Sequence, residues 1–513
     1  MISWLARHRG HNNNTASLNL FRIGQRSFAF IDRWTATAFG LPCLLYLLTL
    51  APTVYNLDSA ELTTATATGG LVRATGYPLY LLLGYLWSWL PVGDIGYRLN
   101  LFSAFNGALT IAITERILRR WVIGPWATFG ALGLLACAPY FWALSLIAEV
   151  YTLHTALMAT LILLLLRWAD DPRPYRLTWV GLVIGLSLGH HGSTILLIPG
   201  CVWYVVTVAP RQTFTPRVLL PALTALFIGL SSYLYLPWRY NTQPAFNYVG
   251  RYDDTGVFQP FDLWKPGGLW WLVSGRDFET SLLAYDKTEL WGELGQFGVQ
   301  LWSAFFAIGI GPGVVGLIVL WRRNWRLNIM LGLMFICNVG FYLGYYVLDK
   351  NTMFLPTYLI WALWLGVGYQ WLLDWVCERD HFPTWPWTIR LLQGVIAGTV
   401  LVAGLWNWNR VDLSNDWSAR TRGETILRDV EPGALIFGWW DTIPIIEYLQ
   451  LVEGQRLDVK PINRFLIAEE DLERLIEREI SRRPVYIDDP PAAWFKTMKV
   501  TSTGPLYRLQ SRQ

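Results

Sequence analysis

One stretch of the sequence decides the fold class: residues 354–376 read FLPTYLIWALWLGVGYQWLLDWV. This run has a single charged residue, Asp374, and is longer than the about 20 apolar residues that a helix needs to cross a bilayer. Of all 513 residues, 53% are hydrophobic and only 15% charged, and the mean hydropathy is +0.31. Soluble domains carry about 25% charged residues. The sequence therefore predicts a polytopic membrane protein and excludes a disordered chain, a nucleic-acid-binding module and an ordinary cytosolic enzyme.

Comparable apolar runs predict about eleven transmembrane helices, so the expected fold class is an all-α polytopic membrane bundle. We place the spans at residues 34–52, 99–118, 122–142, 150–167, 177–190, 193–208, 217–237, 296–320, 326–347, 354–376 and 389–408. The transmembrane domain then covers residues 34–408. Segment 77–90 is apolar and aromatic but too short to cross, and we expect it to lie in the membrane interface.

Basic residues give the orientation. Arginines gather after the second, fourth, sixth and eighth spans, on the side of the basic amino-terminal segment 1–33: Arg116, Arg119, Arg120, Arg167, Arg173, Arg176, Arg211, Arg217, Arg322, Arg323 and Arg326. The positive-inside rule places these loops and the amino terminus in the cytoplasm. Loops 53–98 and 238–295 and the tail 409–513 then lie outside. A twelfth span at 77–90 would invert every later loop and break this pattern.

The tail, residues 409–513, has a composition of its own. Strand-like segments at 434–439, 458–462 and 484–487 alternate with helical patterns at 444–451 and from Leu472 to Ile480. This alternation predicts a small extracytoplasmic α/β domain. Because no glycine-rich dinucleotide fingerprint accompanies it, we infer no nucleotide.

Acidic residues on the outer side are the first candidates for chemistry. Asp58 and Glu61 share one face if their segment is helical, and a carboxylate there can act as general base toward an attacking hydroxyl. The alternative is a capping box that opens a helix, with Asp58 as the N-cap and Glu61 three residues later. The two interpretations can coexist. Glu149, between the third and fourth spans, is a third candidate, or else an interfacial Glu at a helix end.

Cationic and imidazole groups on the same side can bind a phosphate. The adjacent His190 and His191 can donate hydrogen bonds, although neighbouring positions suit one metal ion poorly. Arg239 suits bidentate phosphate contacts, and Lys350 lies in an outer turn. The alternatives are a structural histidine pair, an arginine that snorkels to the surface, and a solvated loop. The sequence allows a divalent metal, but no ligand set requires one.

All of these candidate groups lie on one predicted side of the membrane, and this distribution bears on function. The middles of the spans are nearly free of charge, whereas a proton- or ion-coupled transporter usually needs ionisable groups near the midplane. The distribution favours chemistry at the outer surface. Two other classes stay open: a transporter or flippase of a lipid-linked substrate, and a non-catalytic assembly or receptor protein whose tail binds a cell-wall polymer.

Several motifs carry a family resemblance. They are Asp58-Ser59-Ala60-Glu61, Gly76-Tyr77-Pro78-Leu79-Tyr80, Arg98-Leu99-Asn100-Leu101-Phe102-Ser103, Ala148-Glu149-Val150-Tyr151, Tyr235-Leu236-Pro237-Trp238-Arg239 and Glu453-Gly454-Gln455-Arg456-Leu457-Asp458-Val459. In these motifs the chain resembles the bacterial family of uncharacterised membrane proteins related to eukaryotic transmembrane protein O-mannosyltransferases, within the GT-C glycosyltransferases. The likeness extends over most of the chain, and residues 58–103 are its most specific part.

The resemblance implies a GT-C-like bundle in the bacterial inner (plasma) membrane. It implies a glycosyltransferase that uses a polyprenyl-phosphate sugar, with mannose as a candidate, and inverts the anomeric carbon. The acceptor would be a hydroxyl of a protein, lipid or polysaccharide. Asp58 would be the catalytic carboxylate, and Glu61 and Glu149 would support it or position the acceptor.

The sequence departs from the family pattern just before the Gly76-Tyr77-Pro78 loop motif. The pattern has His-Pro-Pro there, whereas this chain has Arg73-Ala74-Thr75. If that histidine touches the donor, Arg73 replaces it as a phosphate contact. With His190, His191, Arg239 and Lys350, Arg73 therefore completes the set of groups expected to balance the phosphate charge.

Overall fold

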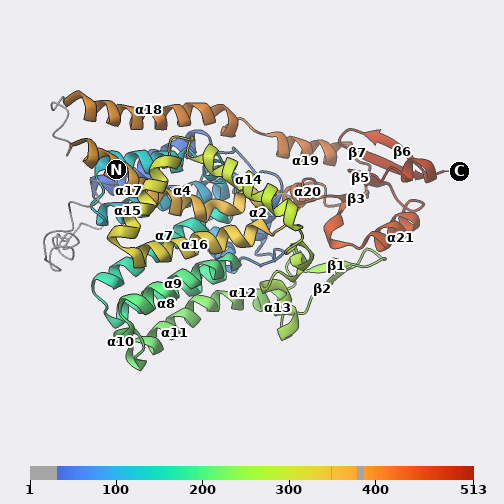
Figure 1. Cartoon of the computed structure of the whole chain (residues 1–513). Coiled ribbons are helices and arrows are strands. Elements are labelled where there is room, and N and C mark those ends of the chain that lie inside the picture. Colours follow the sequence, from blue (N-terminus) through green and yellow to red (C-terminus); the bar gives the residue numbers. More distant parts are fainter. Residues whose placement is uncertain (1–31, 348, 378–385, 513) are drawn as a thin grey trace.

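The computed structural model describes residues 32–347, 349–377 and 386–512 (Figure 1). Most of the chain forms a helical bundle, and the carboxyl terminus lies in a smaller domain at one end of it. The predicted cytoplasmic segment 1–33 falls outside the described residues except for its last two.

The following elements form the bundle and loops 53–98 and 238–295, which are called the first and second outer loops after their predicted side of the membrane. In the bundle these are α1 (Arg33–Leu48), α4 (Ile95–Arg120), α5 (Pro125–Ala136), α6 (Pro139–Ala143), α7 (Tyr151–Asp170), α8 (Pro174–His190), η1 (Gly192–Leu197), α9 (Ile198–Val208), α10 (Pro210–Thr213), α11 (Pro216–Leu230), η2 (Ser231–Leu234), α12 (Tyr235–Asn241), α14 (Lys287–Ala304), α15 (Ile310–Arg323), α16 (Trp325–Leu343), η4 (Lys350–Phe354), α17 (Leu355–Cys377) and α18 (Pro386–Val411). The outer loops add α2 (Asp58–Thr68), α3 (Pro78–Trp87), β1 (Gly250–Tyr252), β2 (Phe258–Pro260), α13 (Pro266–Val273) and η3 (Arg276–Ser281).

The multi-pass helical bundle is confirmed, because every predicted span overlaps a helix. Within the described residues, six helices are long and apolar enough to cross a membrane: Ile95–Arg120, Tyr151–Asp170, Pro216–Asn241, Trp325–Leu343, Lys350–Cys377 and Trp387–Val411. The other predicted spans form shorter helices, for example α1 with 16 residues and α8 with 17. Full-length spans are thus fewer than the about eleven that the apolar runs predict.

The sequence predicts one continuous span at 296–320, and this prediction is wrong. The helix breaks between Ala304 and Ile310, where Phe306 and Ala307 adopt positive φ angles of 51° and 59°. Pro312 follows in the first turn of α15, where its missing N–H costs nothing. The apolar composition continues across the break, so hydropathy alone does not reveal it.

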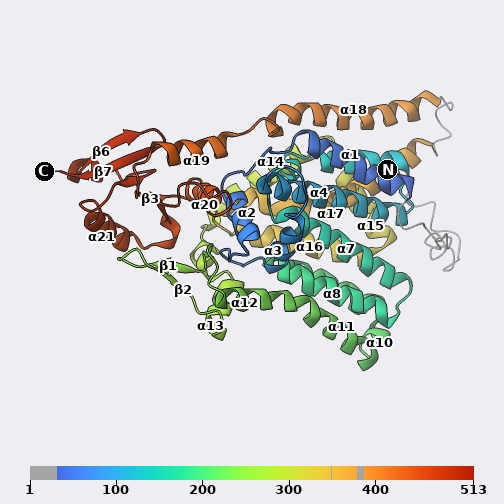
Figure 2. The ribbon, with the colours of Figure 1, turned by 180° about the vertical axis from the view of Figure 1, so that it is seen from behind.

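Segment 77–90 forms the short helix α3, which begins at Pro78 and ends at Trp87. A helix of ten residues is about 15 Å long and does not cross a bilayer. The helix packs against α2, α4 and α8 at the end of the bundle that faces the carboxyl-terminal domain (Figure 2). The interpretation of 77–90 as a non-spanning segment is therefore confirmed.

The carboxyl-terminal domain is built on a five-stranded sheet with the order β4-β3-β5-β7-β6. Its elements are α19 (Ser418–Asp429), β3 (Leu435–Gly438), α20 (Ile443–Leu451), β4 (Lys460–Asn463), η5 (Arg464–Leu466), α21 (Glu469–Glu479), β5 (Val485–Ile487), α22 (Trp494–Thr497), β6 (Met498–Thr503) and β7 (Leu506–Ser511). The predicted α/β domain is confirmed. Strands β3, β4 and β5 are parallel, as expected for alternating strands and helices, and β6 and β7 add an antiparallel edge.

The domain is packed directly onto the first outer loop. Helix α20 lies against α2, and Val54 and Ala60 of that loop share a hydrophobic core with residues of α19 and α20. This packing places the loop that follows strand β3 beside the first turn of α2.

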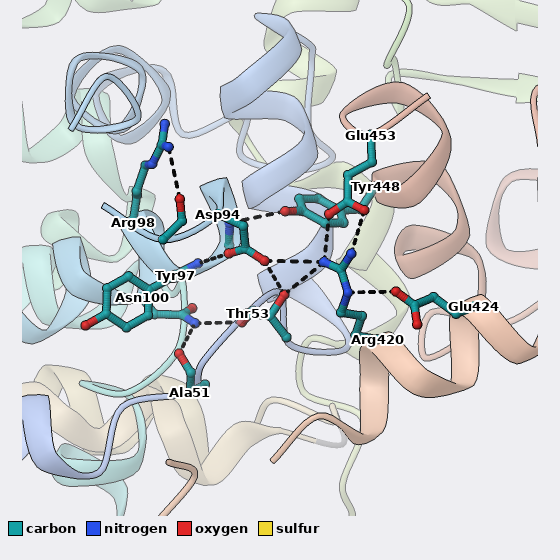
Figure 3. A network of polar contacts seen from close by, with 12 residues as sticks. Ala51, Thr53, Asp94, Tyr97, Arg98, Asn100, Arg420, Glu424, Tyr448 and Glu453 are labelled. Carbon is teal, nitrogen blue, oxygen red and sulfur yellow. Dashed lines mark hydrogen bonds and ion pairs between the residues drawn. The ribbon is translucent and has the colours of Figure 1, made fainter. Parts of the chain in front are cut away.

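Charged contacts fasten the same junction (Figure 3). The Arg420 guanidinium forms a bidentate ion pair with Glu453, in which both N–O distances are 2.7 Å. It also reaches Oγ1 of Thr53 at 3.3 Å and Oδ2 of Asp94 at 3.4 Å. Asp94 in turn caps α4 by accepting a hydrogen bond from the Tyr97 amide at 2.7 Å. The junction between the domain and the bundle is therefore both apolar and ionic.

Candidate active site

Asp58 is the first residue of α2, and it is not the N-cap. Leu57, with φ 54°, occupies the N-cap position and makes no side-chain capping bond. The capping-box interpretation of Asp58 and Glu61 is therefore wrong. Both carboxylates lie in the first helical turn, where the positive end of the helix dipole favours negative charge.

The Asp58 carboxylate meets the carboxyl-terminal domain. Its Oδ1 accepts a hydrogen bond from the indole Nε1 of Trp440 at 2.7 Å, and among the described residues Oδ2 accepts none. Burial and the charge of Asp349 raise the pKa of Asp58 to about 6, against the opposing effects of Trp440 and Arg73. A carboxylate with such a pKa is mostly ionised at neutral pH and suits a general base.

Glu61 lies near the end of the same first turn and is buried, with 5% of its surface exposed. Its Oε1 accepts a hydrogen bond from the Arg73 amide at 2.9 Å. Burial, and next the charge of Asp58, raise the pKa of Glu61 to about 8. Burial and the repulsion between the two groups therefore favour a single negative charge on the pair, and they favour it on Asp58, whose pKa is raised less than that of Glu61.

Glu149 approaches from the loop between α6 and α7. It is 9% exposed, and its Oε2 accepts a hydrogen bond from the Val150 amide at 3.3 Å. The Ser103 side chain, from the third motif, holds the Glu149 backbone through contacts of 3.1 and 3.3 Å. Burial, and then the charge of Asp58, raise the pKa of Glu149 well above its usual value. The structure thus brings the three predicted carboxylates into one electrostatic cluster.

The Gly76-Tyr77-Pro78 motif turns the chain between the Arg73 segment and α3. Gly76 and Tyr77 have φ angles of 81° and 38°, and Pro78 opens the helix. The turn sets the Tyr77 ring 5.5 Å from the ring of His191. Tyr80 of α3 stacks at 6.2 Å on His190. The loop motif and the histidine pair therefore belong to one site.

A third histidine joins the predicted pair. The His154 ring lies 5.2 Å from that of His191 and 6.4 Å from that of His190. The Ser193 hydroxyl bonds Nδ1 of His191 at 2.7 Å and Nε2 of His154 at 3.3 Å. His190 Nε2 contacts the Val150 carbonyl at 2.8 Å, beside Glu149.

Arg73 also lies at this site, next to Glu61. Its guanidinium lies 4.8 Å from the ring of Phe278 and 5.1 Å from those of Trp440 and Phe465. Since these rings come from loop 238–295 and from the carboxyl-terminal domain, Arg73 is where these two parts meet loop 53–98.

The other two predicted phosphate contacts, Arg239 and Lys350, also have partners within the protein. Arg239 donates a hydrogen bond from Nε to the Gly69 carbonyl and a second one, of 3.2 Å, from Nη2 to the Thr68 carbonyl. These two bonds close the end of α2. Lys350 forms an ion pair with Glu293 and donates to the Tyr285 hydroxyl at 2.9 Å. A phosphate would have to compete with these partners.

Several residues at the site were not predicted from the sequence: His154, Ser193, Tyr248, Phe278, Trp440, Glu447 and Phe465. Glu447 of α20 accepts a hydrogen bond from the Tyr248 hydroxyl, and burial raises its pKa to about 8. One usable signal exists for Trp440, because it follows β3 and ligand sites gather at the carboxyl ends of parallel strands. Within the described part of the chain, no group of three or more His, Cys, Asp or Glu residues could hold a metal ion.

Comparisons with known proteins identify relatives of this sequence. A family model described as the N-terminal domain of protein O-mannosyl-transferase TMEM260 matches residues 58–214. Protein O-mannosyl-transferase TMEM260 of Mus musculus is 27% identical over 211 residues, which cover 40% of this chain and 30% of that protein. Its namesake in Dictyostelium discoideum is 21% identical over 467 residues, which cover 81% and 55%. The chain thus spans about half, or less, of the length of these curated relatives.

Solved structures show the same architecture. ArnT from Cupriavidus metallidurans, in crystal structures bound to undecaprenyl phosphate and in the apo state, matches with a TM-score of 0.57 in both. The identities are 13% and 14%, and each match covers 94% of this chain and 99% of the other. Fold and site together define a multi-pass membrane protein with a GT-C-like fold. By sequence, the chain is related to the eukaryotic protein O-mannosyl-transferases, which confirms that part of the resemblance.

Proposed function

We propose that this protein is a membrane glycosyltransferase that moves a sugar, with mannose as the first candidate, from a polyprenyl-phosphate donor to an acceptor hydroxyl. The observation that carries the proposal is geometric: the Asp58 carboxylate, in the first turn of α2 with Glu61, accepts a hydrogen bond from Trp440 where the carboxyl-terminal domain packs on the bundle. The relatives named protein O-mannosyl-transferases and the fold shared with an undecaprenyl-phosphate-binding protein support it.

The proposed step needs a base more than an acid. Asp58 takes the proton of the acceptor hydroxyl while that oxygen forms a bond to the anomeric carbon. The bond from this carbon to the phosphate oxygen breaks, and polyprenyl phosphate leaves with the electron pair. Because the leaving phosphate is stable as an anion, it requires no proton from the enzyme. Attack from the face opposite the phosphate inverts the anomeric carbon.

The remaining groups have roles that follow from their positions. Arg73, His190 and His191 are the candidates for the donor phosphate, because of what they contact. Arg73 lies over Trp440, His190 contacts the Val150 carbonyl next to Glu149, and His191 lies against Tyr77 of the loop motif. Glu149 and Glu61 are candidates for orienting the acceptor. The arginine-rich loops are proposed to face the cytoplasm and this site the outside of the plasma membrane, which agrees with the position of α10 at the far end of the bundle from the sheet.

The experiment uses the full-length protein in lipid nanodiscs. Undecaprenyl-phosphate mannose labelled with tritium is incubated with membranes of a host strain that lacks the gene, and transfer to protein, lipid and polysaccharide fractions is counted. The proposal expects transfer that falls about 100-fold or more in Asp58→Asn. Full activity of that variant would refute the assignment of Asp58 as the general base. Movement of the donor across liposomes without consumption of the donor would favour a flippase instead.

A further inference from the structure

The carboxyl-terminal domain reaches the proposed base through one side chain. Trp440 stands two residues after the end of β3, and its Nε1 donates to Oδ1 of Asp58 at 2.7 Å. The two residues are 382 positions apart in the sequence, so only the docking of the domain joins them. Among the described residues this is the one hydrogen bond that the Asp58 side chain receives.

The indole is held in place on several sides. Its ring lies 5.2 Å from that of Tyr248 and stands perpendicular to that of Phe465 at 5.4 Å. The Arg73 guanidinium lies 5.1 Å from the same ring. Contacts from separate segments leave the indole little freedom, so the direction of its N–H is fixed before a substrate binds.

The neighbouring tryptophan, Trp439, also has its ring near that of Phe465, at 5.2 Å, but among the described residues it makes no hydrogen bond to Asp58. The ring of Trp439 lies 4.1 Å from the guanidinium of Arg464, and its backbone amide donates to Asp488 at 2.6 Å. These partners belong to the carboxyl-terminal domain itself. Among the described residues, the contacts of Trp439 thus lie within its own domain, whereas Trp440 reaches the proposed base, so Trp439 is a matched control.

We propose that Trp440 is a positioning residue of the transfer reaction, whose indole N–H holds Oδ1 of Asp58 and leaves Oδ2 to take the proton of the acceptor hydroxyl. The inference rests on the proposed function and extends it, because it makes the carboxyl-terminal domain part of the active site. A hydrogen bond to the ionised carboxylate also keeps Asp58 in the form that accepts a proton.

The charged groups around Asp58 determine how far the loss of the indole N–H shifts the ionisation of this carboxylate. The charged and titratable groups that face Asp58 from the surrounding elements are Glu61, Arg73, Tyr77, Glu149 and Asp349. Burial and the charge of Asp349 disfavour a negative charge on Asp58, and Trp440 and Arg73 oppose them. Loss of the indole N–H should therefore raise the pH at which the base becomes ionised.

The test compares the pH dependence of transfer by the full-length protein in nanodiscs, with undecaprenyl-phosphate mannose and membranes of the gene-deletion strain. Trp440→Phe removes the donor and keeps an aromatic ring. We expect the acidic limb of the rate profile to move up by about one pH unit, equivalent to about 1.4 kcal/mol, because the lost hydrogen bond favours the ionised carboxylate. Trp439→Phe should leave the limb in place.

A second variant removes only the N–H. Replacement of Trp440 by benzothienylalanine keeps the shape of the indole, so it should move the limb even if Trp440→Phe folds poorly. In an Asp58→Asn background, Trp440→Phe should cause no further loss, since the partner is already gone.

The outcomes separate the two proposals. An unmoved limb in both Trp440 variants, with Asp58→Asn inactive, would overturn the role of Trp440 and leave the proposed function standing. Full activity of Asp58→Asn would overturn the base assignment and the role of Trp440 together.

Discussion

The backbone amide of Arg73 donates a hydrogen bond to Oε1 of Glu61, at 2.9 Å, and so ties the loop after α2 back to the first turn of that helix. Two residues that the sequence marks as separate candidates are thereby parts of one arrangement. The bond fixes Glu61 while the Arg73 side chain extends toward Trp440 and Phe465 of the carboxyl-terminal domain. The carboxylates, the loop motif and the domain are consequently linked, and substitutions at one of them should affect the others.

The rate of transfer should fall as the pH drops through about 6. Burial and the Asp349 charge raise the pKa of Asp58 to about 6, and a general base works only when it is unprotonated. Activity is therefore present above this pH and lost below it. The measurement is kcat/KM for undecaprenyl-phosphate mannose against pH. A profile that is flat between pH 5 and pH 7 would contradict the assignment.

Glu61→Gln should retain most of the activity at pH 7. Burial raises the pKa of Glu61 to about 8, so the native side chain is mainly a neutral carboxyl at that pH, and glutamine is close to it in shape and charge. Its amide oxygen can still accept the Arg73 hydrogen bond. Glu61→Ala leaves that amide without its partner and should cost more than Glu61→Gln. Equal losses in the two variants would show that the negative charge of Glu61 is needed.

Arg420→Ala should loosen the carboxyl-terminal domain from the bundle. The guanidinium joins Glu453 to Thr53 and Asp94, and its removal deletes these charged contacts at a cost of about 1–3 kcal/mol. Limited proteolysis near residue 411 and the thermal unfolding midpoint report the change. Arg428→Ala is the matched control on the same helix, because Arg428 pairs only at the surface with its neighbour Asp429. Similar behaviour of the two variants would contradict a clamp at Arg420.

Gly69→Ala should destabilise the first outer loop. Gly69 has φ 61°, and a Cβ atom there would come within 2.8 Å of Nη2 of Arg239, the group that closes α2. The expected cost is about 1 kcal/mol or more, seen as a lower thermal midpoint. Gly292→Ala is the control, because a Cβ atom there meets nothing within 4 Å in the middle of α14. Its midpoint should stay the same or rise.

The candidate site shows how far sequence reasoning reaches. Asp58, Glu61 and Glu149 are recognisable from the sequence because ionisable groups are rare in an apolar chain, and the structure gathers them. His154 resembles any polar residue of a spanning helix until the fold sets its ring 5.2 Å from His191. Arg239 and Lys350 show the converse, because their charge marks them in the sequence while the fold surrounds them with protein partners.

The membrane class, the positions of the helices and the alternating strands and helices of the tail are determined by the sequence alone. Apolar content and residue period act locally, and each segment carries its own signal. Tertiary structure alone decides that α2 begins at Asp58 without a side-chain cap, that the run 296–320 breaks in two, and that Trp440 meets Asp58. These features depend on which surfaces pack together over hundreds of residues, and local composition does not encode such long-range contacts.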